Sequence, residues 1–135
     1  MFDNKTAPYG VLLLRVLLGV LFLAHVSVKV FVFTVPGFVG YFGSLGLPPV
    51  MAYLTIALEL LGGLALIFGV YARWVAVSLV FELLGTIAVV HSKLGWEFNN
   101  KGGGWEYPAF WATALVVFIL LGDGPYAFRP SRRVG

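Results

Sequence analysis

Long apolar stretches make up most of this chain, and each of them holds or adjoins ionisable residues. The 135 residues are 60% hydrophobic and 11% charged, whereas a soluble domain carries about 25% charged residues. A helix that spans a bilayer needs about 20 mainly apolar residues. A charged side chain at mid-bilayer costs about 2.5–3.5 kcal/mol on insertion scales, so it tends to persist only when it is paired, hydrated or functional. The pattern predicts a membrane protein whose helices enclose a polar interior.

The apolar stretches predict an all-α integral membrane four-helix bundle with up-down topology, in a single membrane domain over residues 1–135. We expect helices at about 11–33, 50–70, 73–92 and 108–122, followed by a basic C-terminal tail at 123–135. The turn between the second and third helices is so short that these two must be antiparallel neighbours. We expect the first helix to be retained rather than cleaved as a signal peptide, because its apolar run continues past a poor cleavage site.

The segment 34–49 between the first two helices is too short and too rich in glycine to span a bilayer. Glycine recurs there at every third position from 37 to 46, and aromatic residues stand at 38, 41 and 42. Aromatic side chains concentrate at the headgroup level of membranes. The segment therefore fits a short interfacial or re-entrant element, and it fits a plain surface loop equally well.

The distribution of cations predicts the orientation. With four spans, both termini and the turn between the second and third helices share one side. Five cations lie on that side, namely Lys5, Arg73, Arg129, Arg132 and Arg133, and two lie on the other, Lys93 and Lys101. Because cytoplasmic loops carry the excess of Lys and Arg, we expect a multi-pass protein with both termini cytoplasmic.

Composition also excludes some functions. The chain has no cysteine, which rules out disulfide exchange, iron–sulfur ligation by cysteine and a thiolate nucleophile. No basic cluster alternates with aromatic residues on a polar face, so we expect no nucleic-acid partner. The expected partners are the lipid bilayer and other membrane-protein subunits or a second copy of the chain.

The polar residues of the first two helices have spacings that predict a shared interior. Arg15, His25 and Lys29 line one face of the first helix. Glu59 lies midway along the second helix and is a natural counter-charge for Lys29 or Arg15. Gly62 and Gly63 follow one turn later, where they allow a helix or subunit to approach closely. A structural ion pair and a functional site both fit this arrangement.

Glu82 and His91 are nine positions apart in the third helix. On a straight α-helix that separation places them on opposite sides, so both cannot line one cavity. Glu82 shares a face with small residues and suits a helix or subunit contact. His91 fits an ordinary interfacial histidine or a contact to the loop that carries Glu106. The different depths of His25 and His91 argue against a haem between them, and no spacing typical of metal ligands occurs, so we predict no metal site and assign no catalytic residue.

Five signatures along the chain resemble the DoxX family. They are Leu13–His25 with Lys29, then Gly40–Pro48, then Leu58–Gly63 with Gly69 and Arg73, then His91, and finally Gly104–Tyr107. The resemblance implies a four-helix bacterial inner-membrane protein, in a family named for a membrane subunit associated with quinone-linked oxidation. The positions that match are Arg15, His25, Lys29, Glu59, His91 and Glu106. Glu82 departs from the pattern, in which an apolar residue is expected there.

Three functions from different classes follow. In the first, the chain is a membrane subunit associated with quinone-linked oxidoreduction, and its six matching residues form a pocket for a quinone headgroup or a proton relay. No cofactor is bound covalently, and quinone is the expected ligand. In the second, the chain is a non-catalytic structural or accessory subunit of a larger respiratory or photosynthetic membrane complex. The third, a small transporter, ranks last because no inverted repeat is visible.

Overall fold

The structure is a computed structural model that describes residues 1–97 and 99–131, and within these ranges it is helical without a β-sheet. Two of the elements are π-helical turns, η1 and η2, and one is a 3-10 turn, η3. In chain order the elements are α1 (Ala7–Ser27), η1 (Val28–Val32), α2 (Val35–Ser44), α3 (Pro49–Phe68), α4 (Ala72–Thr86), η2 (Ile87–His91), η3 (Ser92–Leu94) and α5 (Glu106–Leu121).

Three helices of the described ranges are long and apolar enough to cross a membrane: Ala7–Val32, Pro49–Phe68 and Ala72–Leu94. The fourth apolar helix, α5, has only 16 residues. Large apolar side chains such as Phe31, Phe81 and Phe110 are 70–80% exposed. A contiguous apolar exterior is rare on soluble monomers and suits contact with lipid.

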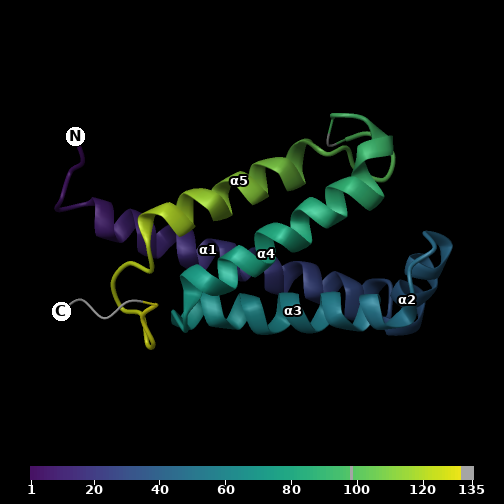
Figure 1. Ribbon diagram of the computed structural model, residues 1–135, viewed down its shortest axis with the longest axis horizontal. Helices are drawn as coiled ribbons and strands as arrows, with labels where there is room; N and C mark the ends of the chain where they lie inside the picture. Colours follow the sequence, from purple (N-terminus) through teal and green to yellow (C-terminus); the bar gives the residue numbers. More distant parts are fainter. Residues whose placement is uncertain (98, 132–135) are drawn as a thin grey trace.

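The helices pack as two antiparallel pairs. α1 lies mainly against α3 and α4 against α5, and the contacts between α3 and α4 join the pairs. The start of the chain, the α3–α4 turn and the segment 122–131 lie at one end, whereas α2 and the loop before α5 lie at the other (Figure 1). Leu18, Phe22, Leu66, Leu79 and Leu115 form the centre of the core and are at most 2% exposed. Toward the end that carries α2, the two pairs diverge (Figure 1).

Glycine allows the backbones of α1 and α3 to approach one another. A Cβ atom added to Gly19 would lie 2.7 Å from the carbonyl oxygen of Gly63, and one added to Gly63 would lie 3.0 Å from that of Gly19. Gly62 packs against the side chain of Leu79 on α4. Small residues at these positions remove the side chains that would otherwise hold the helices apart.

The segment between α1 and α3 is a helix rather than a plain loop. The Thr34 hydroxyl accepts a hydrogen bond from the Gly37 N–H at 3.2 Å, which caps α2 at its N-terminus. Pro36 falls in the first turn, where its missing N–H has no cost. α1 likewise begins at Ala7, earlier than the expected position near 11, with a proline in its first turn.

The segment after α5 is fixed to the bundle up to Ser131. The Asp123 carboxylate accepts hydrogen bonds from the backbone N–H of Arg73 at 3.0 Å and from the Ser131 hydroxyl at 2.9 Å. The Tyr71 N–H donates to the Arg129 carbonyl at 2.8 Å. The remaining cations of the predicted tail, Arg132 and Arg133, lie outside the described residues.

Candidate functional site

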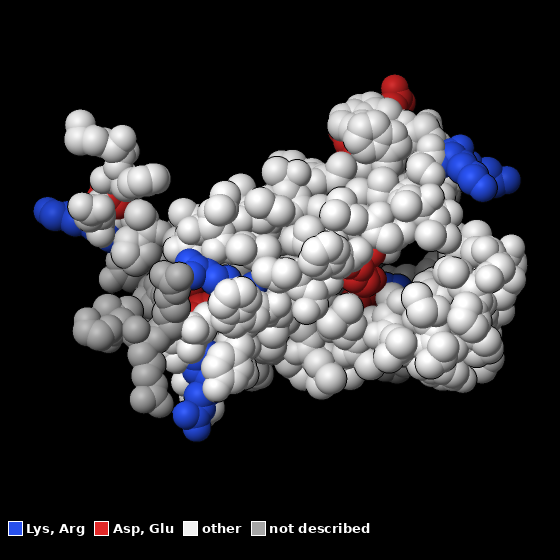
Figure 2. Space-filling model, in the orientation of Figure 1, with Lys and Arg blue, Asp and Glu red and all other residues white. Residues whose placement is uncertain are grey.

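A cavity of about 720 Å³ lies where the two helix pairs diverge. Side chains from α1, α2, α3, α4 and α5 line it, together with both π-helical turns. Figure 2 shows a hollow in this face, with acidic atoms at its edge and a basic group behind them. Most of the wall is apolar or aromatic, including Phe38, Phe42 and Trp111. Small-molecule sites in proteins usually measure about 300–1,000 Å³ and combine such walls with a few polar groups.

Lys29 and Glu59 form an ion pair at the wall of this cavity. Their side chains are 15% and 4% exposed, respectively. Lys29 lies on η1, and its Nζ also stands 5.6 Å from the centre of the Phe38 ring on α2. The sequence left Lys29 and Arg15 open as counter-charges for Glu59, and in the structure Glu59 pairs with Lys29.

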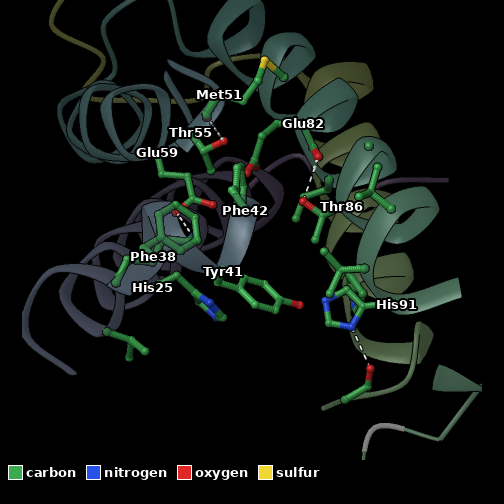
Figure 3. Close-up of a pocket in the computed structure, with 18 of the residues that line it drawn as sticks. His25, Phe38, Tyr41, Phe42, Met51, Thr55, Glu59, Glu82, Thr86 and His91 are labelled. Atoms are coloured by element: carbon green, nitrogen blue, oxygen red, sulfur yellow. Dashed lines mark hydrogen bonds and ion pairs between the residues drawn. The ribbon is translucent and has the colours of Figure 1, made fainter. Parts of the chain in front are cut away.

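Glu82 faces the same pair from α4. Its side chain lines the same cavity, and Figure 3 shows the carboxyl groups of Glu82 and Glu59 directed toward one another. Glu82 Oε2 is buried and has no hydrogen-bond partner in the described part of the chain.

His91 lines this cavity together with Glu82, so the expectation that they point to opposite sides is wrong. The reason is the π-helical turn η2, Ile87–His91, which lies between them. A π-helical turn holds more residues than an α-helical one, so each residue advances the helix by a smaller rotation. The turn therefore brings His91 back toward the face of Glu82, and its Nδ1 atom contacts the Gly103 carbonyl at 2.7 Å.

His25 reaches the cavity from α1 and contacts Tyr107 on α5. The Tyr107 hydroxyl lies 3.1 Å from His25 Nε2, and the two rings stack with centroids 5.8 Å apart. His91 meets the edge of the Tyr107 ring at 6.5 Å, so Tyr107 lies between the two histidines. Sequence reasoning missed Tyr107 as a site residue, although its spacing of four from Trp111 predicts that both share one face of α5. Both do line the cavity.

Two residues of the sequence-predicted site lie elsewhere. Arg15 is 1% exposed, and its Nη1 donates to the Asp123 carbonyl at 2.5 Å, at the end of the bundle that carries the α3–α4 turn. Glu106 lines a second hollow, of about 790 Å³, beside α1 and α5. The six residues of the predicted pocket therefore do not all lie together. Four of them line one cavity with Glu82, namely His25, Lys29, Glu59 and His91.

The chemistry available in the cavity is that of hydrogen bonding and proton exchange. It contains one ammonium group, two carboxyl groups, two imidazoles and two phenols, all set in apolar surroundings. Electrostatic interactions and hydrogen bonds are stronger in such surroundings than in water. No group of three His, Asp or Glu side chains suited to a metal ion occurs within 1–97 and 99–131.

Comparison with known proteins gives consistent matches. The family model described as DoxX matches residues 10–92, the range that contains His25, Lys29, Glu59, Glu82 and His91. The Bacillus subtilis (strain 168) protein named "Putative oxidoreductase CatD" is 41% identical over 98 residues, which cover 73% of this chain and 72% of that protein. The Escherichia coli (strain K12) protein named "Inner membrane protein YphA" is 29% identical over 138 residues, which cover 98% of this chain and 96% of that protein. No solved structure matches.

Proposed function

Because this chain belongs to the DoxX family, we propose that it is a membrane subunit of a quinone-linked oxidoreductase and that its cavity holds the quinone headgroup. The observation that carries the proposal is the convergence of Lys29, Glu59, Glu82, His25 and His91 on one apolar cavity. The name of the Bacillus relative, which includes "oxidoreductase", supports the same class of activity.

The cavity suits the shape and polarity of a quinone headgroup. Such a headgroup is a flat, neutral ring with oxygen atoms at opposite edges. Phe38, Tyr41 and Phe42 of α2 offer aromatic faces against which a ring can stack. The Lys29 ammonium offers hydrogen-bond donors to an oxygen, and the carboxyl groups beside it can exchange protons with the ligand. The apolar exterior beside the cavity suits the hydrocarbon tail of a membrane quinone.

We further propose that α5 is a fourth crossing, which completes an up-down four-helix bundle. Its 16 residues span about 24 Å at 1.5 Å per residue, against a hydrocarbon thickness of about 30 Å. Local thinning of the bilayer and flanking aromatic residues such as Trp105 can accommodate a short helix. Lys5, Arg73 and Arg129 then lie together on the cytoplasmic side, and the inner membrane is the location given by the name of the Escherichia relative.

A partner protein supplies the redox group in this proposal. Side chains can bind the quinone and hold its protons, but transfer of two electrons is the work of a cofactor. The chain has no cysteine to ligate an iron–sulfur cluster. Its part is therefore to present the quinone to the partner within the membrane.

Quinone binding by the purified protein tests the proposal. We would measure the dissociation constant of decylubiquinone for the protein in lipid nanodiscs, with empty nanodiscs as the blank. Lys29→Met should weaken binding about 10- to 100-fold, since a hydrogen bond to a charged group contributes about 1.5–3 kcal/mol. Thr113→Val is the matched control, because the Thr113 hydroxyl on α5 donates to the Ala109 carbonyl at 2.8 Å and lies outside the cavity. Wild-type protein that binds no more quinone than empty nanodiscs would refute the proposal in favour of an accessory subunit.

A further inference from the structure

α3 and α4 touch one another below the cavity and separate at the level of the cavity itself. Gly62 of α3 packs against the Leu79 side chain of α4. Gly85 lies six positions further along α4, in the cavity wall, and a Cβ atom added there would have nothing within 4 Å. Thr55 on α3 and Thr86 on α4 donate their hydroxyl protons to carbonyl groups of their own helices (Figure 3). Neither of these protons joins the two helices.

The separation leaves an opening between α3 and α4 that leads from the cavity to the outside of the bundle. Met51 of α3 and Phe81 of α4 line the cavity and are also 43% and 70% exposed. Figure 2 shows the hollow on this face, with acidic atoms at its edge, where α3 and α4 diverge in Figure 1. Gly85 lies nine positions before Leu94, the end of its apolar span, which is about 13 Å at 1.5 Å per residue. The opening therefore faces the hydrocarbon region of the bilayer.

Aromatic side chains close the opposite side of the cavity, between α1 and α5. The Tyr107 hydroxyl of α5 lies 3.1 Å from His25 Nε2 of α1. Trp111, one turn further along α5, packs against His25 and Phe22 with ring centroids 4.7 and 4.4 Å apart. These contacts hold α1 against α5 beside the cavity, so the route to the lipid runs between α3 and α4.

Building on the proposed function, we infer that the hydrocarbon tail of the quinone leaves the cavity between α3 and α4, past Gly85, and lies against Met51 and Phe81. Acidic groups beside an opening to lipid are costly, and a ligand with its ring in the cavity and its tail in the opening covers them. The missing side chain at Gly85 leaves room for a chain of methylene groups. The ligand class is thus a ring with a long apolar tail, taken up sideways from the bilayer.

Two ligands with the same ring test this tail site. Decylubiquinone carries a ten-carbon tail, and ubiquinone-0 carries none. Dissociation constants of both are measured for the wild type and for Gly85→Phe in lipid nanodiscs. Each variant is compared with the wild type for one ligand at a time, so partitioning of that ligand into the lipid cancels. Gly85→Phe should weaken the binding of decylubiquinone about tenfold more than that of ubiquinone-0, because its ring overpacks the space that the tail uses.

Gly10→Phe is the matched control. Gly10 lies on α1, is exposed, and would have nothing within 4 Å of an added Cβ atom, as at Gly85. It does not line the cavity. The same bulky substitution at this position should therefore leave both dissociation constants at their wild-type values.

A second measurement uses the wild-type protein and needs no variant. A decylubiquinone analogue with a diazirine at the ring end of its tail is bound in nanodiscs and irradiated, and the labelled peptides are identified by mass spectrometry. We expect the label on α3 and α4 near Met51 and Phe81. An excess of decylubiquinone should suppress this labelling, since the two compounds compete for one site.

The outcomes separate the two proposals. Label on α1 or α5 in place of α3 and α4, or equal weakening of both ligands by Gly85→Phe, would overturn the inference and leave the proposed function intact. Binding of neither ligand by the wild type would overturn both. If Gly85→Phe folds poorly, the labelling of the wild type decides the question alone.

Discussion

Substitution of Gly19 by alanine tests whether close backbone contact holds α1 to α3. The added Cβ atom would lie 2.7 Å from the Gly63 carbonyl oxygen and 2.7 Å from Ile67 Cγ1. Favourable contacts between carbon atoms occur at about 3.5–4.0 Å. The isoleucine side chain can rotate away, but the carbonyl oxygen belongs to the helix backbone, so the two helices must separate.

The size of the effect follows from two opposing terms. Overpacking of a well-packed interface lowers the free energy of unfolding by about 1–3 kcal/mol, whereas alanine in place of glycine within a helix raises it by up to about 1 kcal/mol. Gly10 lies on the same helix, and an added Cβ there would have nothing within 4 Å. Gly10→Ala therefore gains the helix propensity without the clash. The difference in the free energy of unfolding between the two variants, about 1–3 kcal/mol, is the cost of the clash.

The measurement is unfolding of the purified variants by sodium dodecyl sulfate in dodecylmaltoside micelles, followed by far-ultraviolet circular dichroism. Gly19→Ala should unfold at a lower fraction of dodecyl sulfate than the wild type, and Gly10→Ala at an equal or higher one. If the two variants agree to within about 0.5 kcal/mol, the range of ordinary surface substitutions, then the close contact does not hold the helices together.

Two further predictions concern charged residues, and a third concerns the orientation of the chain in the membrane. Glu59→Gln should lower the free energy of unfolding by about 3 kcal/mol, because it leaves the Lys29 charge unpaired. The Lys29→Met/Glu59→Gln double variant should have a free energy of unfolding close to that of the wild type. Purely additive losses in the same unfolding assay would argue against the pair. Arg15→Met should release the segment around Asp123 and accelerate chymotryptic cleavage after the exposed Tyr126 several-fold, because the carbonyl groups lose a charged donor. An unchanged cleavage rate would contradict this role. A green fluorescent protein fused to the C-terminus should fluoresce and a fused alkaline phosphatase should be inactive, as expected for a cytoplasmic terminus; the reverse pattern would exclude the proposed orientation.

The long helices are predictable from the sequence because a run of about 20 apolar residues in a membrane can satisfy its backbone only as a helix. The ends of these helices are harder to predict. α1 begins at Ala7, before the hydropathy rises, since Pro8 permits a first turn. The sequence leaves α2 open between a short interfacial or re-entrant element and a plain loop, because its repeated glycines lower helix propensity. A threonine cap and packing against α3 stabilise the helix.

The site is only partly predictable. The pairing of Glu59 with one of two cations follows from the cost of burying a lone charge, but the choice of Lys29 depends on where η1 turns the chain. Whether Glu82 and His91 share a cavity depends on a single π-helical turn. Such a turn changes hydrogen bonding in the backbone and leaves no mark in composition or hydropathy.

The partner of Arg15 is hidden from sequence patterns for a different reason. An acidic side chain is the expected partner of a buried guanidinium, yet the closest hydrogen bond of Arg15 is to the backbone carbonyl of Asp123. Every residue has a carbonyl group, so no residue type marks it. Only the path of the chain after α5 identifies it.

The bond between Arg15 and Asp123 joins residues that are 108 positions apart, and this has a consequence for biosynthesis. The first helix leaves the ribosome well before its hydrogen-bond acceptor has been translated. Its guanidinium must therefore remain near the headgroups or in contact with the insertion machinery until the final segment arrives. A nonsense codon just after α5 would spare all the long apolar helices, and its product should still be recognised by membrane quality-control proteases because that cation never finds its acceptor.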